Sequence, residues 1–169
     1  MSYSRWIAVR KVLLGAVLVA LAAAVSLFIK ENLDVKSPED ALPDLTIQVN
    51  DLPIASEMAL RAGYEWNFWT TTEKNTPAYT PEDLLRLVYP VDMPPRSVIE
   101  LGFSIQLKDL RVSRADDAEF RYFIEMAGAD DGQIIAPAQA GRYMYKIEAG
   151  FGRRGSVIYY LLVDIQEPV

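Results

Sequence analysis

The feature that most constrains this chain is an uncharged run near its N-terminus. Residues 12–29 are rich in Val, Leu and Ala, with Arg10 and Lys11 before them and Lys30 and Glu31 after them. A helix over this run rises about 27 Å, close to the thickness of the hydrocarbon core of a bilayer. We therefore predict a transmembrane helix, or signal anchor, over residues 12–29.

The charges on the two sides of this run predict its orientation. The first eleven residues carry three basic residues and no acid, whereas acids outnumber basic residues just after the run. Short segments rich in Lys and Arg tend to stay in the cytoplasm. We expect a single-pass cell-membrane protein in which residues 1–11 are cytoplasmic, residues 30–43 form a linker and residues 44–169 form an extracytoplasmic domain.

A cleaved signal peptide is the alternative interpretation of the same run. Residues 20–24 include small alanines that suit a signal peptidase site, but the apolar run continues through residues 25–29. The hydrophobic part of a cleaved signal is usually about 7–15 residues long. The length of this run favours an uncleaved anchor. The absence of Cys excludes a lipoprotein, whose lipid is attached to that residue.

Composition limits what the exported part binds or catalyses. The first thirty residues hold four basic and no acidic residues, which leaves 13 basic and 23 acidic residues, a net charge of −10, for the rest. This charge disfavours nucleic acid, anionic polymers and anionic lipids as partners. The absence of both His and Cys excludes Ser-His-Asp triads, thiol catalysis and disulfides, and most zinc sites. We expect no cofactor, no metal and no enzymatic activity.

Residues 44–169 alternate mostly between apolar and polar residues, with the period of two that is typical of β-strands. The pattern predicts a turn at Asn50-Asp51 and a hairpin loop over residues 150–155. Seven short strands separated by turns favour an antiparallel immunoglobulin-like sandwich, with Trp66 in its core. The predicted strands cover residues 45–49, 64–68, 99–105, 110–112, 120–124, 143–149 and 157–165.

One segment departs from this period. Thr80 is a helix-capping residue, Pro81 suits the first helical position, and residues 82–83 are acids in the first turn. Apolar residues follow at helical spacing over residues 84–88, and Pro90 ends the pattern. We predict one short helix that crosses between two strands.

Four motifs, taken in order, resemble those of uncharacterised exported domains of Gram-positive bacteria. The resemblance spans residues 63–165 and implies an immunoglobulin-like surface domain without established chemistry. The chain departs from the family pattern at Pro95-Arg96, where Pro-Gly is expected, and at Phe151, where Trp is common. The motifs are the strand at Gly63-Tyr64-Glu65-Trp66, the Pro-x-x-Leu helix at 81–85, the proline-led strand at 93–101 and the closing hairpin at 137–159.

A few aromatic and basic residues are candidates for a binding surface. Trp69 breaks the strand alternation beside the polar run 70–76, where it either covers the end of the core or stacks on a sugar or a protein partner. Tyr79 follows that run. Arg153 and Arg154, in the predicted hairpin loop, either contact an acidic partner or form a solvated turn.

Two acidic groups, at residues 116–119 and 130–132, contain oxygen ligands of the kind that bind calcium. Neither group has the spacing of a calcium-binding loop, so we interpret both as turn and loop residues.

These features predict a membrane-anchored module for protein interaction or structure at the cell envelope, with an envelope protein as its partner. A cell-wall glycan-binding module that uses Trp69, Tyr79 and the threonine-rich loop is the alternative. A hydrolase of unrecognised type is the second alternative, and it requires a deep pocket lined by carboxylates.

Overall fold

A computed structural model describes residues 3–117, 119–129 and 131–166 of the chain. The chain forms two compact units, Met1–Ala41 and Leu42–Val169, and each is described by itself. Asp130 of the second predicted acidic group lies outside the described residues, as do the first residues of the predicted cytoplasmic segment and the last residues of the predicted domain.

The first unit is helical. Helix α1 spans Tyr3–Lys36 and helix α2 spans Pro38–Ala41. Within Val9–Lys36, a stretch of 18 residues has a mean hydropathy of 2.8. The helix is therefore long and apolar enough to serve as a membrane anchor or a signal sequence. Most of the predicted linker over residues 30–43 is helical as well, because α1 continues to Lys36 and α2 follows it.

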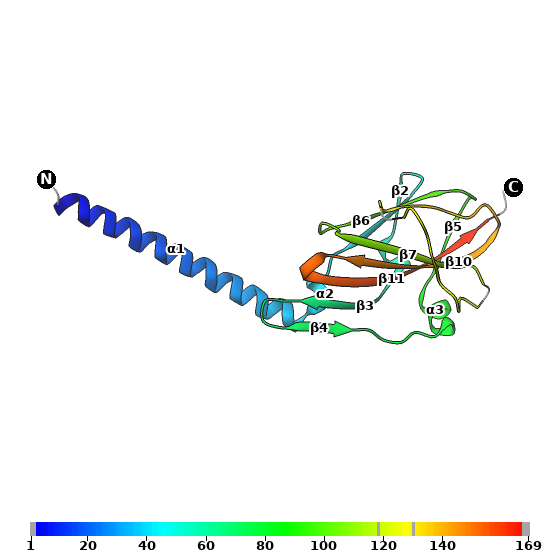
Figure 1. Cartoon of the computed structure of the whole chain (residues 1–169), viewed down its shortest axis with the longest axis horizontal. Helices are drawn as coiled ribbons and strands as arrows, with labels where there is room; N and C mark the ends of the chain where they lie inside the picture. Colours follow the sequence, from blue (N-terminus) through cyan, green and yellow to red (C-terminus); the bar gives the residue numbers. More distant parts are fainter. Residues whose placement is uncertain (1–2, 118, 130, 167–169) are drawn as a thin grey trace. The chain divides into compact units, whose positions relative to one another are not determined.

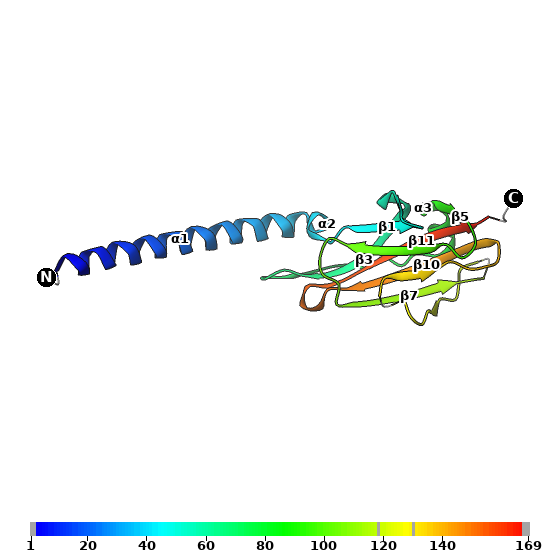
Figure 2. The same cartoon turned by 90° about the horizontal axis from the view of Figure 1, so that it is seen from above.

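The second unit contains two antiparallel sheets, shown in Figures 1 and 2. It is mainly β, as the alternating pattern predicts. The smaller sheet has the order β2 (Leu52–Ile54), β1 (Leu45–Val49), β6 (Val98–Phe103) and β9 (Gln133–Ile135). The larger sheet has the order β4 (Thr72–Asn75), β3 (Ala59–Asn67), β11 (Gly155–Ile165), β10 (Gly141–Gly150), β7 (Asp109–Ala115) and β8 (Ile124–Glu125).

Strand β5 (Pro90–Met93) joins the larger sheet by a parallel pairing with the last four residues of β11. Strand β3 pairs antiparallel with the first seven residues of β11, on the edge that β10 leaves open. Two strands of opposite direction therefore share one edge of β11. The chain between them carries β4 and then helix α3 (Pro81–Leu87), which is the crossover helix that the sequence predicts.

Helix α3 begins with a reciprocal capping box. The Oγ1 atom of Thr80 accepts a hydrogen bond of 3.2 Å from the backbone N–H of Asp83. In return, Oδ2 of Asp83 accepts one of 3.1 Å from the backbone N–H of Thr80. The Thr80 hydroxyl also donates a hydrogen bond of 2.7 Å to Asp83 Oδ2, and this bond, followed by the one from the backbone N–H of Thr80, lowers the pKa of the Asp83 carboxyl. Two backbone donors at the start of the helix are thus satisfied locally, which allows so short a helix to form here.

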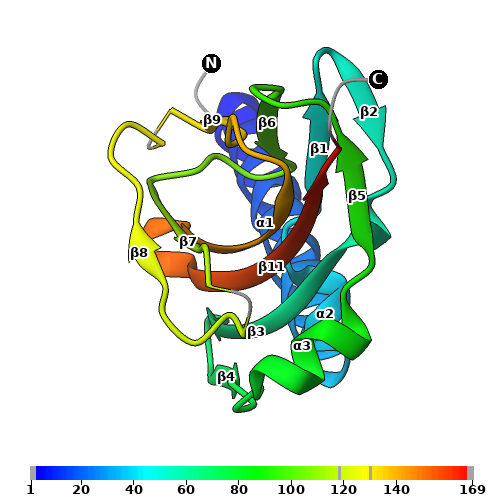
Figure 3. The same cartoon turned by 90° about the vertical axis from the view of Figure 1, so that its right-hand side faces the viewer.

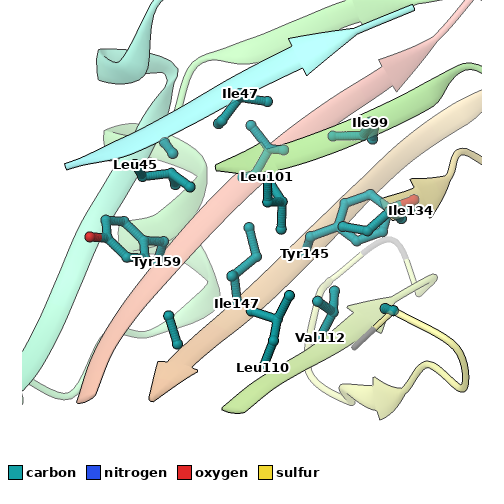
Figure 4. Packing of buried hydrophobic residues seen from close by; sticks show 14 of the residues in the cluster. Leu45, Ile47, Ile99, Leu101, Leu110, Val112, Ile134, Tyr145, Ile147 and Tyr159 are labelled. Atoms are coloured by element: carbon teal, nitrogen blue, oxygen red, sulfur yellow. The ribbon is translucent and has the colours of Figure 1, made fainter. Parts of the chain in front are cut away.

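The main core lies between the two sheets, as Figure 4 shows. Ile47 and Ile99 of the smaller sheet face Tyr145 and Ile147 of β10, and all four are at most 1% exposed. Trp66 is 0% exposed, which confirms its predicted place in the core, and its ring meets that of Phe151 edge-on, with 5.7 Å between the ring centres. Alternate residues on these strands therefore bury one complete face of the larger sheet.

The predicted strand over residues 120–124 is wrong. Only the two residues of β8 pair with β7 there. Phe120 instead adopts a φ of 48°, and the Asp117 carboxylate accepts a hydrogen bond of 2.9 Å from the backbone N–H of Arg121. The turn lets Phe120 bury its ring at 3% exposure, so tertiary packing outweighs the local alternation.

The polar run 70–76, predicted as an exposed loop, contains β4. This short strand pairs with β3 and forms an edge of the larger sheet. Its polar residues carry no alternating pattern, and polar residues are common on edge strands because they discourage further pairing.

Candidate binding surfaces

A second hydrophobic cluster lies on the outer face of the larger sheet, the face turned away from the smaller sheet. Leu84 and Val88 come from α3 and the residue after it, and they pack on Met144 of β10 and Leu162 of β11. Phe120 joins them from the turn after β7. Figure 3 shows α3 on this side of the larger sheet. We call the surface over this cluster the α3 face.

The α3 face carries exposed apolar side chains at its rim. Leu85 and Leu87 are 42% and 44% exposed, and Tyr89, just after the helix, is 68% exposed. A hollow of about 370 Å³ opens beside Leu85 and is lined also by Phe120. The helical period of 3.6 residues explains this exposure. Leu84 and Val88 lie on the buried side of the helix, and its other leucines therefore lie outside.

Charged groups border the same hollow. Asp116 and Arg142 both line it. Arg142 Nε donates a hydrogen bond of 3.2 Å to Asp164 Oδ2. Arg114 Nη2 donates one of 2.8 Å to Asp116 Oδ2, and its guanidinium carbon lies 5.4 Å from the ring centre of Tyr143. The hydrogen bond to Asp116 is the main cause of the raised pKa of Arg114.

The first acidic group serves local structure. Asp116 pairs with Arg114, and Glu119 pairs with Arg121. Backbone hydrogen bonds from residues 121 and 122 lower the pKa of Asp117. Within the described ranges, His, Cys, Asp and Glu form no group of three or more that suits a metal ion. These contacts support the interpretation of Asp116, Asp117 and Glu119 as residues that stabilise a loop.

A different surface forms where two hairpins end. Trp69, at the turn between β3 and β4, is 72% exposed. Asn67 Nδ2 donates a hydrogen bond of 3.0 Å to the backbone oxygen of Arg153 and so ties this turn to the β10–β11 loop. Arg153 and Arg154 are both exposed in that loop, on the short helix η2 (Gly152–Arg154). We call the surface of Trp69, Arg153 and Arg154 the tip surface.

Gly155 makes the close approach of these hairpins possible. Its φ is 120°, and a Cβ atom there would run into the carbonyl group of Glu65. Only glycine fits at this position without moving β3 away from β11.

The predicted candidate residues therefore divide between two surfaces. The tip surface unites Trp69, Arg153 and Arg154, but Tyr79 is half-buried and packs with Tyr160 in the cluster under the α3 face. Tyr160 lies opposite Leu60, six residues along β3 from Trp66. That spacing corresponds to about 20 Å along a strand. The glycan site that combined Trp69 with Tyr79 is therefore not assembled in one place.

Sequence reasoning missed a groove of about 510 Å³ between β1 and β3. Asp44, Glu57, Arg61 and Tyr159 all line it. Arg61 Nη2 lies 3.9 Å from Asp44 Oδ1, and the Tyr159 hydroxyl donates a hydrogen bond of 2.9 Å to the backbone oxygen of Pro43. Burial raises the pKa of Tyr159. No local motif links these residues, because distant strands bring them together.

The α3 face was also missed, although the exposed leucines of the predicted helix were a signal. A helix with apolar residues at 84, 85, 87 and 88 has more apolar surface than one buried stripe requires. Comparison with protein-family models, with curated proteins and with solved structures gave no match to this chain.

Proposed function

We propose that this chain is a membrane-anchored protein whose extracytoplasmic, immunoglobulin-like domain binds an envelope protein through the α3 face. The observation that carries the proposal is the exposed Leu85 at the edge of a hollow of about 370 Å³, on a helix whose Leu87 and following Tyr89 are exposed as well. An exposed apolar side chain beside a hollow is typical of a protein-binding surface, where a partner's side chain is buried.

The chemistry of the surface describes the partner. A hollow next to Leu85 and Phe120 suits an aliphatic or aromatic side chain. Arg142, whose side chain is 58% exposed and pairs with Asp164, lines the hollow together with Asp116, so groups of both charges border it. An apolar anchor residue flanked by polar residues is therefore the recognition element that we propose.

The properties of α1 and of its flanking residues support a location at the cell membrane, with the binding domain outside the cytoplasm. Helix α1 is apolar enough to span a membrane. The basic residues before its apolar run and the acids after it favour a cytoplasmic N-terminus. The two antiparallel sheets and the order of the four sequence motifs support an immunoglobulin-like domain related to exported Gram-positive proteins. The proposal assigns no catalytic reaction to the chain.

Photo-crosslinking in intact cells tests this function. A photoreactive amino acid replaces Leu85 in the full-length protein, and the same amino acid replaces Leu52 as the control, because Leu52 is 69% exposed on the smaller sheet. We expect position 85 to capture one recurrent protein that position 52 does not capture. Equal capture from both positions, or no capture from position 85, would contradict the proposal.

A cell-wall glycan is the second candidate ligand, and it is favoured by one observation, the exposed indole of Trp69. An indole face stacks on sugar rings. A pull-down with insoluble wall glycan compares the wild-type protein with Trp69→Ala. If the wild type does not bind, or if the variant binds equally well, the glycan hypothesis is wrong.

A further inference from the structure

The first residues of the domain lie toward the end that carries the tip surface. Asp44 and Ser104 exchange two hydrogen bonds there, of 2.9 and 3.0 Å. Phe103, the residue before Ser104, places its ring 5.7 Å from that of Phe151 in the β10–β11 loop. In Figure 1, β3 and β10 end and β11 begins at this same end. The first residues of the domain therefore lie beside Tyr159, four residues along β11 from Gly155, which corresponds to about 13 Å along a strand.

This end is basic, although the exported part of the chain is acidic. Lys108 joins Arg153 and Arg154 there, because its backbone N–H donates a hydrogen bond of 2.9 Å to the oxygen of Gly150. In the part of the chain that the structure describes, neither arginine forms an ion pair. Among the acids near this end, Asp109 faces Arg111 at 3.7 Å and Glu65 faces Lys74 at 3.1 Å, while Glu73 of β4 lies opposite Trp66.

Trp69 adds an apolar group to this basic end. Its side chain is 72% exposed on the same surface as the two arginines. A tryptophan beside arginines is the combination that favours the interface between lipid and water, where the indole enters the headgroup layer and the guanidinium groups meet phosphates.

The connection to α1 limits how far the domain can stand from a bilayer if α1 is the anchor. Five residues separate Lys36, the last residue of α1, from Leu42, the first residue of the domain. Even a fully extended chain of this length spans no more than about 20 Å. The helical residues after Lys30 add about 10 Å. The first residue of the domain is thus tethered within about 30 Å of the headgroups.

We propose that the tip surface binds the headgroups of anionic phospholipids on the membrane that holds the anchor. The net charge of the exported part led us to disfavour anionic lipids, but the charge is unevenly distributed: the basic tip is attracted while the acidic remainder is repelled. Contact at the tip therefore orients the domain on the bilayer and turns the α3 face, some 20 Å along the sheet, toward a partner. The proposal rests on the anchor and is independent of any partner at the α3 face.

Depth-dependent quenching on the full chain tests the proposal. The chain has no Cys, so one introduced Cys carries a fluorophore at a chosen place. Thr70→Cys reports on the tip, and Ala138→Cys reports on the opposite end of β10 as a matched position. The labelled proteins are placed in nanodiscs with headgroup-attached quenchers, made with or without phosphatidylglycerol. We expect quenching at position 70 but not at 138, severalfold stronger with phosphatidylglycerol and weaker at high salt.

A charge reversal separates this contact from simple tethering. Arg154→Glu is compared with Arg96→Glu, because Arg96 is also exposed but lies in the turn hydrogen-bonded to Pro137, at the other end. We expect Arg154→Glu to lower the bound fraction about fivefold and Arg96→Glu to leave it unchanged. Equal quenching at positions 70 and 138, or quenching that ignores both phosphatidylglycerol and Arg154→Glu, would overturn the proposal. Absent quenching together with Trp69-dependent wall-glycan binding would overturn it in favour of a glycan. Crosslinking from position 85 would be unaffected in either case.

Discussion

The two faces of the larger sheet are covered in different ways. On the inner face, Tyr145, Ile147 and Leu161 are 0% exposed because a second sheet covers the whole area. On the outer face, Met144 is also 0% exposed, because α3 covers it. Two residues further along β10, Lys146 is only half-buried and forms an ion pair of 3.0 Å with Glu148. A sheet covers a sheet completely, whereas a seven-residue helix covers part of it and leaves an apolar rim. The incomplete cover creates the α3 face.

The largest difference between the faces should appear when an inner residue is shortened. Leu161→Ala removes a 0% exposed side chain between two sheets that cannot close over the gap. We expect a loss of about 4 kcal/mol in the free energy of unfolding, near the upper end for such changes. Urea unfolding measures it. Leu52→Ala, at a 69% exposed leucine, is the control and should change stability by less than about 0.5 kcal/mol.

The same change on the outer face should have a smaller effect. Leu84 is 2% exposed, so Leu84→Ala also removes a buried side chain. A single short helix can settle onto the sheet, and we therefore expect a loss of about 2 kcal/mol. The two unfolding curves are compared under identical conditions. If Leu84→Ala proves as costly as Leu161→Ala, the faces are equally rigid and our comparison is wrong.

Alkaline pH distinguishes the faces through their tyrosines. Burial raises the pKa of Tyr145 to about 12, although the nearby Arg114 guanidinium offsets part of the effect. An unfolded tyrosine has a pKa of about 10. The folded chain therefore holds this proton more tightly, and the associated stability is complete below about pH 10 and is lost as the pH rises toward 12.

At about pH 11 the expected loss from Tyr145 is about 1.4 kcal/mol. Urea unfolding across this range measures the slope, and Tyr145→Phe should reduce it. Burial also raises the pKa of Tyr160 on the outer face, but its ring is only half-buried, so Tyr160→Phe should reduce the slope less. A larger effect from Tyr160→Phe would reverse the order of the two faces.

The smallest expected effect concerns the cap of α3. Thr80→Ala removes the hydroxyl that accepts from Asp83 N, and we expect a loss of about 1 kcal/mol. Thr80→Ser keeps the hydroxyl and should restore stability. Hydrogen exchange of the amides in α3 shows whether the loss is confined to the outer cover. Faster exchange throughout β10 would mean that α3 stabilises the inner core as well.

The strands with clear alternation were predictable, and the short ones were not. The pattern of 157–165 follows from burial of one face of β11, and Tyr159 and Tyr160 do lie on opposite faces, at 2% exposed and half-buried. Strands of three or four residues, such as β2 and β5, are too short to show a period. Their pairing depends on partners that are distant in the sequence.

The candidate residues were predictable as types but not as a set. The sequence placed Trp69 at the end of a strand and Arg153 in a hairpin loop, and both positions are found in the structure. Nothing in the sequence showed that Asn67 links the two hairpins or that Tyr79 belongs with Tyr160 on the α3 face. Such groupings arise from strand register, which a single sequence does not reveal.

The shared edge of β11 has a consequence for how this domain can vary. Because β3 and β5 both dock on that edge, the residues between them leave the central strand and return to it without altering its pairing with β10. The segment from the β3–β4 turn through α3 can thus vary while the pairing of β11 with β3, β5 and β10 stays the same. A segment of another length or sequence between β3 and β5 would give the same two sheets a different binding surface.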